Sequence, residues 1–459
     1  MAFDASVVSK TPRVSKTSRQ RIAVVGTGIA GLSAAWLLDQ AHDITVYETE
    51  NRPGGHSNTV DVALGGRRAA VDTGFIVYND RNYPNLVALF EHLGVPTKAS
   101  NMSFSASLDD GAFEYAGSDI NGLLGQRSNV VRPRFWRMIR DVLRFYAEAP
   151  KLLDTDLSID VTLGDYLEAN GYSSAFIDDH ILPMSAAIWS TTAPEMRAFP
   201  VAAFVRFFFS HGLLSLSNRP QWRTVEGGSR EYVRRLTASF ADRIRLGAGV
   251  RRIHRHGSRV LIDDAQGNRD VFDHVVIATH ADEALGLLAD PTETERRLLG
   301  AFAYTPNETI LHSDETLMPK RRSVWSSWNY IGDGAAASAK PLCVTYWMNR
   351  LQGIDPALPL FVTLNPDRAP REDLVHRRFS YMHPLFDRVA LRAQQDLWQL
   401  QGVNNSWFCG SYFGYGFHED ALQSGLAVGE MLGAVRRPWQ VANESGRIAA
   451  APLNLVAAE

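Results

Sequence analysis

Residues 22–55 constrain the fold of this chain more than any other segment. The apolar run 22–25 is typical of a short buried strand, and an apolar helix is expected over 32–38. A second strand is expected over 44–47, directly before Glu48. Between the first strand and the helix stands a glycine-rich turn, Gly26-Thr27-Gly28-Ile29-Ala30-Gly31. This order of strand, turn, helix, strand and acid predicts a βαβ unit that binds a dinucleotide.

Each part of this segment has a physical role in such a unit. Gly26 permits the tight turn, Gly28 lets a pyrophosphate approach the backbone, and Gly31 lets the helix lie close to the sheet. Ile29 and Ala30 of the turn are also expected to contact the cofactor, and the unpaired N–H groups at the helix start, with the helix dipole, favour phosphate. Glu48 stands at about the usual distance for a carboxylate that accepts ribose hydroxyls.

The segment after Glu48 indicates which dinucleotide is bound. It matches the pattern Glu-x-x-x-Arg-x-Gly-Gly, and on this motif the chain resembles the flavin-dependent amine oxidoreductase superfamily. The resemblance implies FAD, with Thr49 near the nucleotide and Arg52 supporting the pyrophosphate. Gly54 and Gly55 would let the backbone pack beside the flavin. Family members usually continue with arginine, where this chain has His56, either a titratable group near the flavin or a loop histidine.

The resemblance also implies cofactor contacts from distant parts of the chain. The segment containing Thr73, Gly74 and Phe75 would pass near the flavin ring, and the backbone of Val250 would touch the adenine end. A strand expected over 272–278 leads into Thr279. The last contacts precede or open a helix expected over 420–432, and they involve Gly410, Ser411, Gly416, Phe417 and His418. Where relatives often have an acid after the first of these glycines, this chain has Ser411.

The predicted fold class combines α/β and α+β architecture. We expect a Rossmann-type FAD-binding domain that is discontinuous in sequence, and a second, mixed substrate domain of helices and an antiparallel sheet. The expected boundaries are 21–85, 217–290 and 405–436 for the first, and 86–216 and 291–404 for the second. Residues 1–20 are expected to be a disordered basic tail, with weak attraction to anionic membrane as an alternative role, and 437–459 a C-terminal tail.

Composition narrows the class of protein. The 459 residues, 45% of them hydrophobic, suffice for two domains. A net charge of −3 provides no overall electrostatic attraction for nucleic acid. Cys343 and Cys409 cannot form a disulfide framework, which suits a reducing cytosol. We find neither an apolar run of transmembrane length nor a signal-peptide core, so a cytoplasmic location is expected, with peripheral contact at the inner membrane surface allowed.

The candidate catalytic residues are His418, Glu419 and His56. His418 and Glu419 would act as a general base or tune the flavin potential, or else cap the following helix. No metal site is expected. Amine oxidases of the family commonly use a lysine near the flavin, but Lys320 stands beside Arg321 and Arg322, which indicates a solvated face. A lysine-dependent amine oxidation is therefore not expected.

Aromatic segments are candidates for the lining of a substrate cavity, with core packing as the alternative. The predicted lining consists of Ile188, Trp189, Phe204, Phe208, Trp328, Tyr346 and Tyr412. The Gly247-Ala248-Gly249 turn lacks a third glycine, since Arg252 stands there, so no second dinucleotide site is expected. The electron acceptor therefore stays open between oxygen, a quinone and a carrier protein.

Three later segments, 325–330, 345–350 and 410–420, resemble a bacterial subgroup often encoded beside cyclopropane-fatty-acid-synthase-like methyltransferases. The resemblance implies work on unsaturated or methylated acyl chains. Our leading hypothesis is an FAD-dependent oxidoreductase that removes hydride from an acyl lipid, a desaturase-like step. The alternatives are an oxidase of small amines, a redox-neutral double-bond isomerase, and a flavoprotein that only binds and delivers a lipid or partner.

Overall fold

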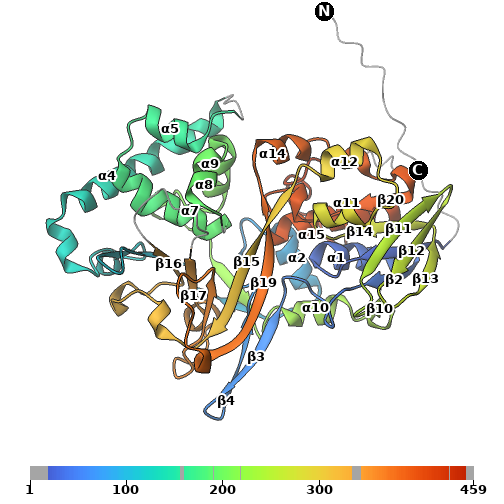
Figure 1. Cartoon of the computed structure of the whole chain (residues 1–459), viewed down its shortest axis with the longest axis horizontal. Helices are drawn as coiled ribbons and strands as arrows, with labels where there is room; N and C mark the ends of the chain where they lie inside the picture. Colours follow the sequence, from blue (N-terminus) through green and yellow to red (C-terminus); the bar gives the residue numbers. More distant parts are fainter. Residues whose placement is uncertain are drawn as a thin grey trace, which may run out of the picture. The chain divides into compact units, whose positions relative to one another are not determined.

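The computed structural model describes residues 19–155, 160–189, 191–217, 219–332, 343–433 and 435–450. Contacts within this part divide the chain into two compact units. The first takes its described residues from 1–55, 236–301 and 393–459, and the second from 56–235 and 302–392 (Figure 1). Most of the tail expected over 1–20, and the last residues of the tail expected over 437–459, lie outside the described residues.

A five-stranded parallel sheet forms the centre of the first unit. Its order is β10 (Ile244–Arg245), β2 (Asp43–Tyr47), β1 (Arg21–Val25), β14 (His274–Ile277) and β20 (Ser406–Phe408). Val24 pairs with Val46 on one side and with Val276 on the other, and all three side chains are fully buried. Apolar runs of this kind are typical of parallel strands covered on both faces. The predicted α/β arrangement is confirmed.

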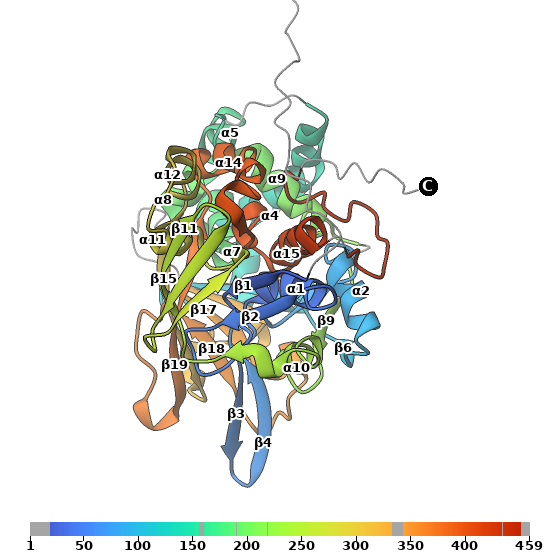
Figure 2. The same cartoon turned by 90° about the vertical axis from the view of Figure 1, so that its right-hand side faces the viewer.

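Two helices of this unit pack together through glycines. They are α1 (Ile29–Leu38) and α15 (His418–Gly433), which lie side by side in Figure 2. A Cβ atom on Gly425 would stand 2.2 Å from the carbonyl oxygen of Ala30, and one on Gly429 would stand 3.2 Å from Cβ of Leu37. The absence of side chains at both positions therefore sets the spacing of the helices.

The remaining elements of the first unit surround this core. A three-stranded antiparallel sheet contains β11 (Val250–His256), β12 (Arg259–Asp264) and β13 (Arg269–Phe272). Helices α11 (Ala281–Leu287) and α12 (Glu293–Leu299) follow β14. The buried Arg255 guanidinium donates to both oxygens of the buried Glu295 carboxylate, with Nη2 3.0 Å from Oε2, and so ties β11 to α12.

The second unit contains a seven-stranded mixed sheet. Its order is β19 (Val375–Leu385), β15 (Ala303–His312), β18 (Phe361–Leu364), β17 (Cys343–Trp347), β16 (Trp328–Gly332), β7 (Phe104–Leu108) and β8 (Phe113–Ala116). Neighbours are antiparallel except β16 and β7, which run parallel. The sequence pattern of residues 323–330 predicts a strand, but the strand begins only at Trp328, because Arg322–Val324 forms a 3₁₀ turn. The antiparallel expectation holds for every other pair.

The helices of the second unit include two that the sequence predicts. The sequence patterns of residues 134–149 and 201–214 each predict a helix, and the structure has α4 (Pro133–Glu148) and α9 (Val201–Ser210) there. The second ends early because Gly212 adopts φ +66°, the left-handed conformation that terminates helices. The other helices are α2 (Pro84–His92), α3 (Ile120–Leu123), α5 (Leu163–Ala169), α6 (Ser174–Phe176), α7 (Leu182–Trp189), α8 (Ala193–Ala198), α10 (Arg230–Leu236) and α13 (Met348–Gln352). Helix α14 (Arg388–Gln394) ends in the first unit.

Two small sheets complete the second unit. The hairpin β3 (Thr59–Leu64) and β4 (Arg67–Asp72) forms one, and β5 (Tyr78–Asn79), β9 (Trp222–Val225) and β6 (Thr97–Ala99) form the other. Across all the described ranges, no helix has both the length and the apolar composition that a membrane span requires.

Candidate functional site

The predicted cofactor residues of the first unit follow the carboxyl ends of its parallel strands. β1 ends before the Gly26 turn, β2 before Glu48, β14 before Thr279 and β20 before Gly410. Because the strands are parallel, these four loops lie at one edge of the sheet, where open α/β folds bind ligands. The edge is also joined to the turn before β11, since the Ala248 N–H donates to the Glu48 carbonyl at 2.9 Å.

Two glycines of the turn are required by the protein itself. Gly26 adopts φ +100°, and a Cβ atom there would stand 2.9 Å from the Ala278 carbonyl oxygen. A Cβ atom on Gly31 would stand 2.0 Å from the Gly26 carbonyl oxygen. Each position therefore excludes a side chain, as the sequence predicts for a tight turn and a close helix.

Gly28 is different, because nothing in the protein requires it to be glycine. Its backbone, at φ −61° and ψ 169°, suits any residue, and a Cβ atom there would meet nothing within 4 Å. This position caps α1, and the open space lies where the first N–H groups of the helix begin. A glycine explained neither by conformation nor by packing fits the approach of a pyrophosphate. The residues present thus fit a dinucleotide.

The Glu48 carboxylate is held by backbone and retains acceptor capacity. Oε2 accepts from Thr27 N at 3.1 Å and from Thr27 Oγ1, and Oε1 accepts from Glu50 N at 2.9 Å. An ionised carboxylate offers about four acceptor positions, so one stays available on Oε1 for a hydroxyl. Thr27 is a contact that was not predicted, although its place between two glycines was a signal. Arg52 pairs with Glu50 at 2.8 Å.

The Gly54–Gly55 pair packs against the glycine turn. Gly54 N donates to Thr27 O and to Thr27 Oγ1, both at 3.1 Å, and a Cβ atom on Gly55 would stand 3.1 Å from Gly28 Cα. On the other side of the Glu48 segment, a Cβ atom on Gly249 would stand 2.6 Å from Thr49 Oγ1. Val250 opens β11 directly after that glycine. Residues far apart in sequence are thus brought together.

The loop from Gly410 to Phe417 winds tightly into α15. Gly410 N donates to Ser424 Oγ at 2.9 Å, Gly416 N donates to Ser411 O at 3.2 Å, and Phe417 N donates to Asp420 Oδ2 at 2.8 Å. Burial raises the pKa of Asp420, and Arg447 Nε stands 2.8 Å from its Oδ1. The described part of the expected C-terminal tail therefore contacts the start of α15.

His418 and Glu419 are the first two residues of α15. They are shielded from water to different degrees. His418 is partly accessible, yet desolvation by its surroundings lowers its pKa to about 3, so the ring is neutral at pH 7. Glu419 is fully buried, and its Oε1 accepts from Gln423 Nε2 at 2.9 Å. The first residue is therefore a neutral hydrogen-bonding group at a helix N-terminus.

Four predicted residues belong by contacts to the second unit, namely His56, Thr73, Gly74 and Phe75. They lie together. Phe75 N donates to His56 O at 2.8 Å, and a Cβ atom on Gly74 would stand 2.2 Å from the same oxygen.

A tyrosine missed by the sequence analysis joins this group. The ring of Tyr381, on β19, lies 5.0 Å from that of His56, and its hydroxyl lies 2.8 Å from Thr73 Oγ1 and accepts from Asn58 Nδ2 at 2.9 Å. The His383 ring lies 6.0 Å from that of His56. Aromatic and imidazole residues at alternate positions of a strand were the available signal.

The predicted cavity residues fall into two groups in the second unit. On α7 and α9, the rings of Phe204 and Phe208 stack at 4.2 Å, and the Trp189 ring lies 5.8 Å from that of Phe204. On β16 and β17, Trp328 and Tyr346 meet edge to face at 5.0 Å. Ile188 precedes the tryptophan of the first group, and Tyr412 belongs to the first unit. The rings of Phe199 and Phe207 also contact Trp189, at 5.2 and 4.7 Å.

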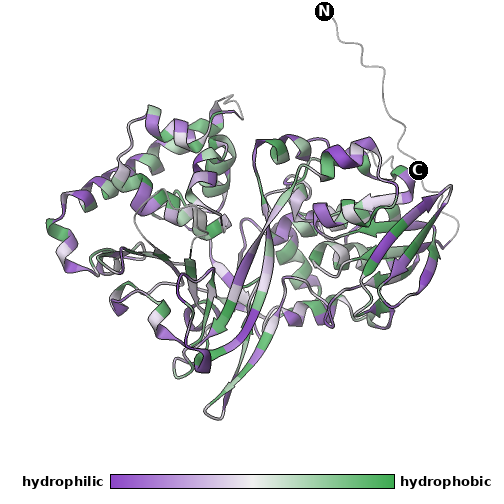
Figure 3. Ribbon diagram, viewed as in Figure 1, coloured by the Kyte–Doolittle hydropathy of each residue, from purple (hydrophilic) through white to green (hydrophobic). Residues whose placement is uncertain are grey.

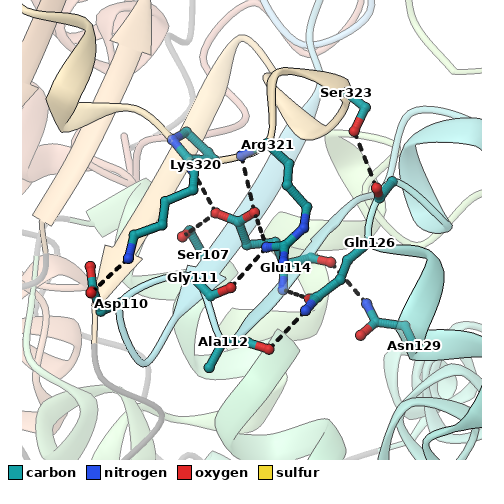
Figure 4. A network of polar contacts seen from close by, with 12 residues as sticks. Ser107, Asp110, Gly111, Ala112, Glu114, Gln126, Asn129, Lys320, Arg321 and Ser323 are labelled. Carbon is teal, nitrogen blue, oxygen red and sulfur yellow. Dashed lines mark hydrogen bonds and ion pairs between the residues drawn. The ribbon is translucent and has the colours of Figure 1, made fainter.

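Lys320 lies on an exposed surface, where its Nζ pairs with Asp110 at 2.6 Å (Figure 4). The neighbouring backbone surrounds a buried carboxylate that the sequence analysis missed. Glu114 accepts from Ser107 Oγ at 2.8 Å, from Lys320 N at 2.7 Å and from Arg321 Nη1 at 2.8 Å. In the part of the chain that the structure describes, no group of histidine, cysteine and acidic residues is placed to hold a metal ion.

Comparison with known proteins places the chain in a family. A model of the flavin containing amine oxidoreductases matches residues 29–430. AofH of Mycobacterium tuberculosis, named as a flavin-containing monoamine oxidase, is 28% identical over 279 residues. That match covers 59% of this chain, and the chain spans 59% of the length of AofH.

Two solved structures share the fold. A triple mutant of putrescine oxidase, from a redesign of cofactor binding, has a TM-score of 0.66 at 16% identity and covers 91% of this chain and 99% of its own. A CLA-producing fatty acid isomerase from P. acnes has a TM-score of 0.61 at 17% identity, covering 90% and 98%. The family match establishes a flavin cofactor and an enzyme: this chain belongs to the flavin-containing amine oxidoreductase family.

Proposed function

We propose that this chain is an FAD-dependent oxidoreductase that removes a hydride from an apolar acyl-lipid substrate in a desaturase-like reaction. The observation that carries the proposal is the uncharged character of the predicted substrate residues. Trp189, Phe204, Phe208 and Trp328 have no ionisable group, and burial raises the pKa of Tyr346 well above its usual range. Such a lining suits an acyl chain better than a cationic amine.

The first unit supplies the proposed cofactor site. Gly28 leaves room for the pyrophosphate, the remaining acceptor position of Glu48 suits a ribose hydroxyl, and Arg52 adds positive charge nearby. Bound flavin would supply the two-electron acceptor for the hydride. The proton that leaves the neighbouring carbon as the double bond forms would pass to a base, for which Glu419 and His56 are the remaining candidates. The N-terminus of α15 offers the positive end of a helix dipole, which stabilises negative charge.

His418 is proposed to position and polarise rather than to take a proton. A ring whose pKa is about 3 is a weak base at neutral pH, since efficient general bases have a pKa near the working pH. Its neutral nitrogen atoms still accept or donate hydrogen bonds at the start of α15. Of the base, tuning and capping roles that the sequence left open, the lowered pKa argues against the base and favours tuning of the cofactor's surroundings.

Two alternatives have specific support. The name of AofH and the fold of putrescine oxidase favour an oxidase of small amines. Against this, Lys320 pairs with Asp110 on an exposed surface, which argues against the lysine-dependent form of that chemistry. The fold of the fatty acid isomerase favours an acyl substrate with no net oxidation.

Anaerobic bleaching of the flavin separates these functions. Purified protein is mixed with two panels, one of amines and one of unsaturated and methyl-branched phospholipids in micelles. Bleaching by lipid alone supports the proposal, and bleaching by an amine overturns it. Formation of a rearranged lipid without any bleaching would establish the isomerase instead.

A matched variant tests the reasoning about the lysine. Lys320→Met removes only an exposed ion pair, so we expect the bleaching rate to stay within about twofold of the wild type. Asp110→Asn, which removes the other partner, serves as the control. A loss of bleaching in Lys320→Met alone would point back to lysine-dependent amine chemistry.

A further inference from the structure

Helix α4 has an exposed side that is unlike an ordinary solvated helix face. Its buried side carries Phe135 and Phe145, which are fully buried, and Phe145 lies 5.5 Å from Phe176 of α6. Trp136 and Leu143 are 50% and 48% exposed. They are seven residues apart and therefore share one face. Figure 3 shows hydrophobic and hydrophilic residues interspersed along this helix.

The turn before α4 extends the same apolar feature. It is a 3₁₀ helix, η1 (Arg127–Val131), in which Val131 is 82% and Val130 45% exposed. Trp136 Nε1 donates to Val130 O at 2.8 Å, so the indole is held beside these valines. Single exposed apolar side chains are common on proteins, but a group of them marks an interaction surface.

The same segment is strongly basic. Residues 120–140 contain five arginines and no acidic residue, although the whole chain has a net charge of −3. Arg134 pairs with Asp179 at 2.7 Å, and Arg140 with Asp141 at 3.1 Å. Arg127 and Arg137 are exposed, and neither forms an ion pair with any described residue.

We propose that this α4 surface, formed by Arg127, Val130, Val131, Trp136, Arg137, Arg140 and Leu143, docks on an anionic phospholipid membrane. Tryptophan and aliphatic side chains enter the boundary between headgroups and acyl chains, where tryptophan is enriched. Unpaired arginines attract the negative headgroups, and their long side chains reach past the apolar residues to them. A nucleic acid would match the arginines but not the exposed valines.

Membrane docking would bring the enzyme to the acyl-lipid substrate, and this role of the α4 surface rests on the proposed function. An enzyme that oxidises acyl lipids must meet them where they reside, and a basic, apolar surface supplies that contact. The docking itself is testable without any turnover, so each idea can fail alone.

The test is sedimentation with vesicles of pure phosphatidylcholine and with an equimolar mixture of phosphatidylglycerol and phosphatidylcholine, using the full-length flavoprotein. We expect binding to the anionic vesicles only, weakening as salt is raised. Val131→Glu should lower the partition coefficient about tenfold or more, because it places a charge at the interface. The double variant Arg127→Gln with Arg137→Gln should lower it by a similar factor at low salt.

Two matched controls come from elsewhere on the surface. Val389→Glu alters a valine that is 61% exposed and next to an arginine, and Arg251→Gln removes an exposed arginine of β11. Both should bind vesicles as the wild type does. Thermal melts of every variant establish that each is folded.

The proposal is overturned if no anionic vesicle is bound, or if the variants and the controls behave alike. It is also overturned if light scattering shows self-association that Val131→Glu removes, because the occupant is then a second copy. Vesicle binding without bleaching by micellar lipid would sink the proposed chemistry alone. Bleaching without vesicle binding would sink the docking alone.

Discussion

Helices α1 and α15 of the first unit and the mixed sheet of the second unit are stabilised by different kinds of contact. In the first, backbone approaches backbone: Gly31 lets α1 contact the turn before it, and Gly425 lets α15 contact α1. In the second, buried polar side chains join segments distant in sequence, as Glu114 does for β8 and the residues before β16. The His312 ring of β15 likewise lies 2.7 Å from Thr363 Oγ1 of β18.

This difference explains where sequence patterns are informative. A close backbone contact tolerates only glycine, so it leaves a recognisable residue at a regular spacing. A buried hydrogen-bonded cluster can be built from many residue types, and nothing in the local sequence identifies its members. Four experiments test this contrast.

The largest effect is expected at Gly31. In Gly31→Ala, the added methyl group would lie 2.0 Å from a carbonyl oxygen, so α1 must move, and we expect a loss of more than about 4 kcal/mol in unfolding free energy. In Gly28→Ala the methyl group meets no protein atom, and we expect a loss of at most about 1 kcal/mol at this helix cap. That variant should instead lose flavin.

Chemical denaturation of the apoproteins, together with the flavin absorbance per protein, separates the two effects. Full flavin content in Gly28→Ala would show that the open space is not where the cofactor binds. A stable Gly31→Ala protein would contradict the role of glycine in packing this unit.

The buried carboxylate of the second unit should come next. Glu114→Gln weakens the hydrogen bonds that the buried carboxylate accepts from Ser107, Lys320 N and Arg321, and we expect a loss of about 2–3 kcal/mol in unfolding free energy. Glu315→Gln, which breaks the exposed pair with Arg322, should cost less than about 1 kcal/mol. Urea denaturation measures both. Similar small losses would mean that Glu114 does not hold the second unit together.

A buried histidine should make stability depend on pH. Burial lowers the pKa of His312 to about 4, so the folded protein keeps the ring neutral while the unfolded chain takes up a proton below its ordinary pKa of 6.5. The folded protein has its full stability above about pH 6.5, and its unfolding free energy decreases as the pH falls from 6.5 towards 4. On going from pH 7 to pH 5, we expect this residue to lower the unfolding free energy by about 2 kcal/mol.

The comparison for this prediction is made with two variants. His312→Gln should show a shallower decline of unfolding free energy with falling pH than the wild type, whereas His256→Gln, at an exposed position, should follow the wild type. Parallel declines in all three proteins would refute the prediction.

The smallest effects should be equal in the two units. Thr292 of the first and Thr192 of the second each accept a hydrogen bond from the backbone of a glutamate three residues later, at 3.2 and 3.4 Å. Thr292→Ala and Thr192→Ala should each cost about 1 kcal/mol, and serine at either position should restore most of it. A difference of more than about 1 kcal/mol between the losses in the two variants would show that the effect of a helix cap also depends on the unit.

The sequence predicts the first unit well and the second only in outline. The turn at Gly26 and the strand ending in Glu48 were recognisable because their contacts are local or require glycine. Tyr381 was missed because its hydroxyl bonds Thr73 and Asn58, more than 300 residues earlier. Glu114 was missed for the same reason, since its partners lie near residue 320. Pairings that depend on the folded chain leave no local spacing.

The division of the first unit among three stretches of chain has a consequence for biosynthesis. Translation delivers β1 and α1 first, but β14 much later, and β20 and α15 only after every strand of the second unit has been made. Helix α1 is buried on nearly all sides in the folded protein. Because the segments that cover it are made last, its apolar side chains stay exposed to solvent on the nascent chain until then. We therefore expect flavin to bind only after synthesis is complete, and chaperones to bind α1 between its own synthesis and that of α15.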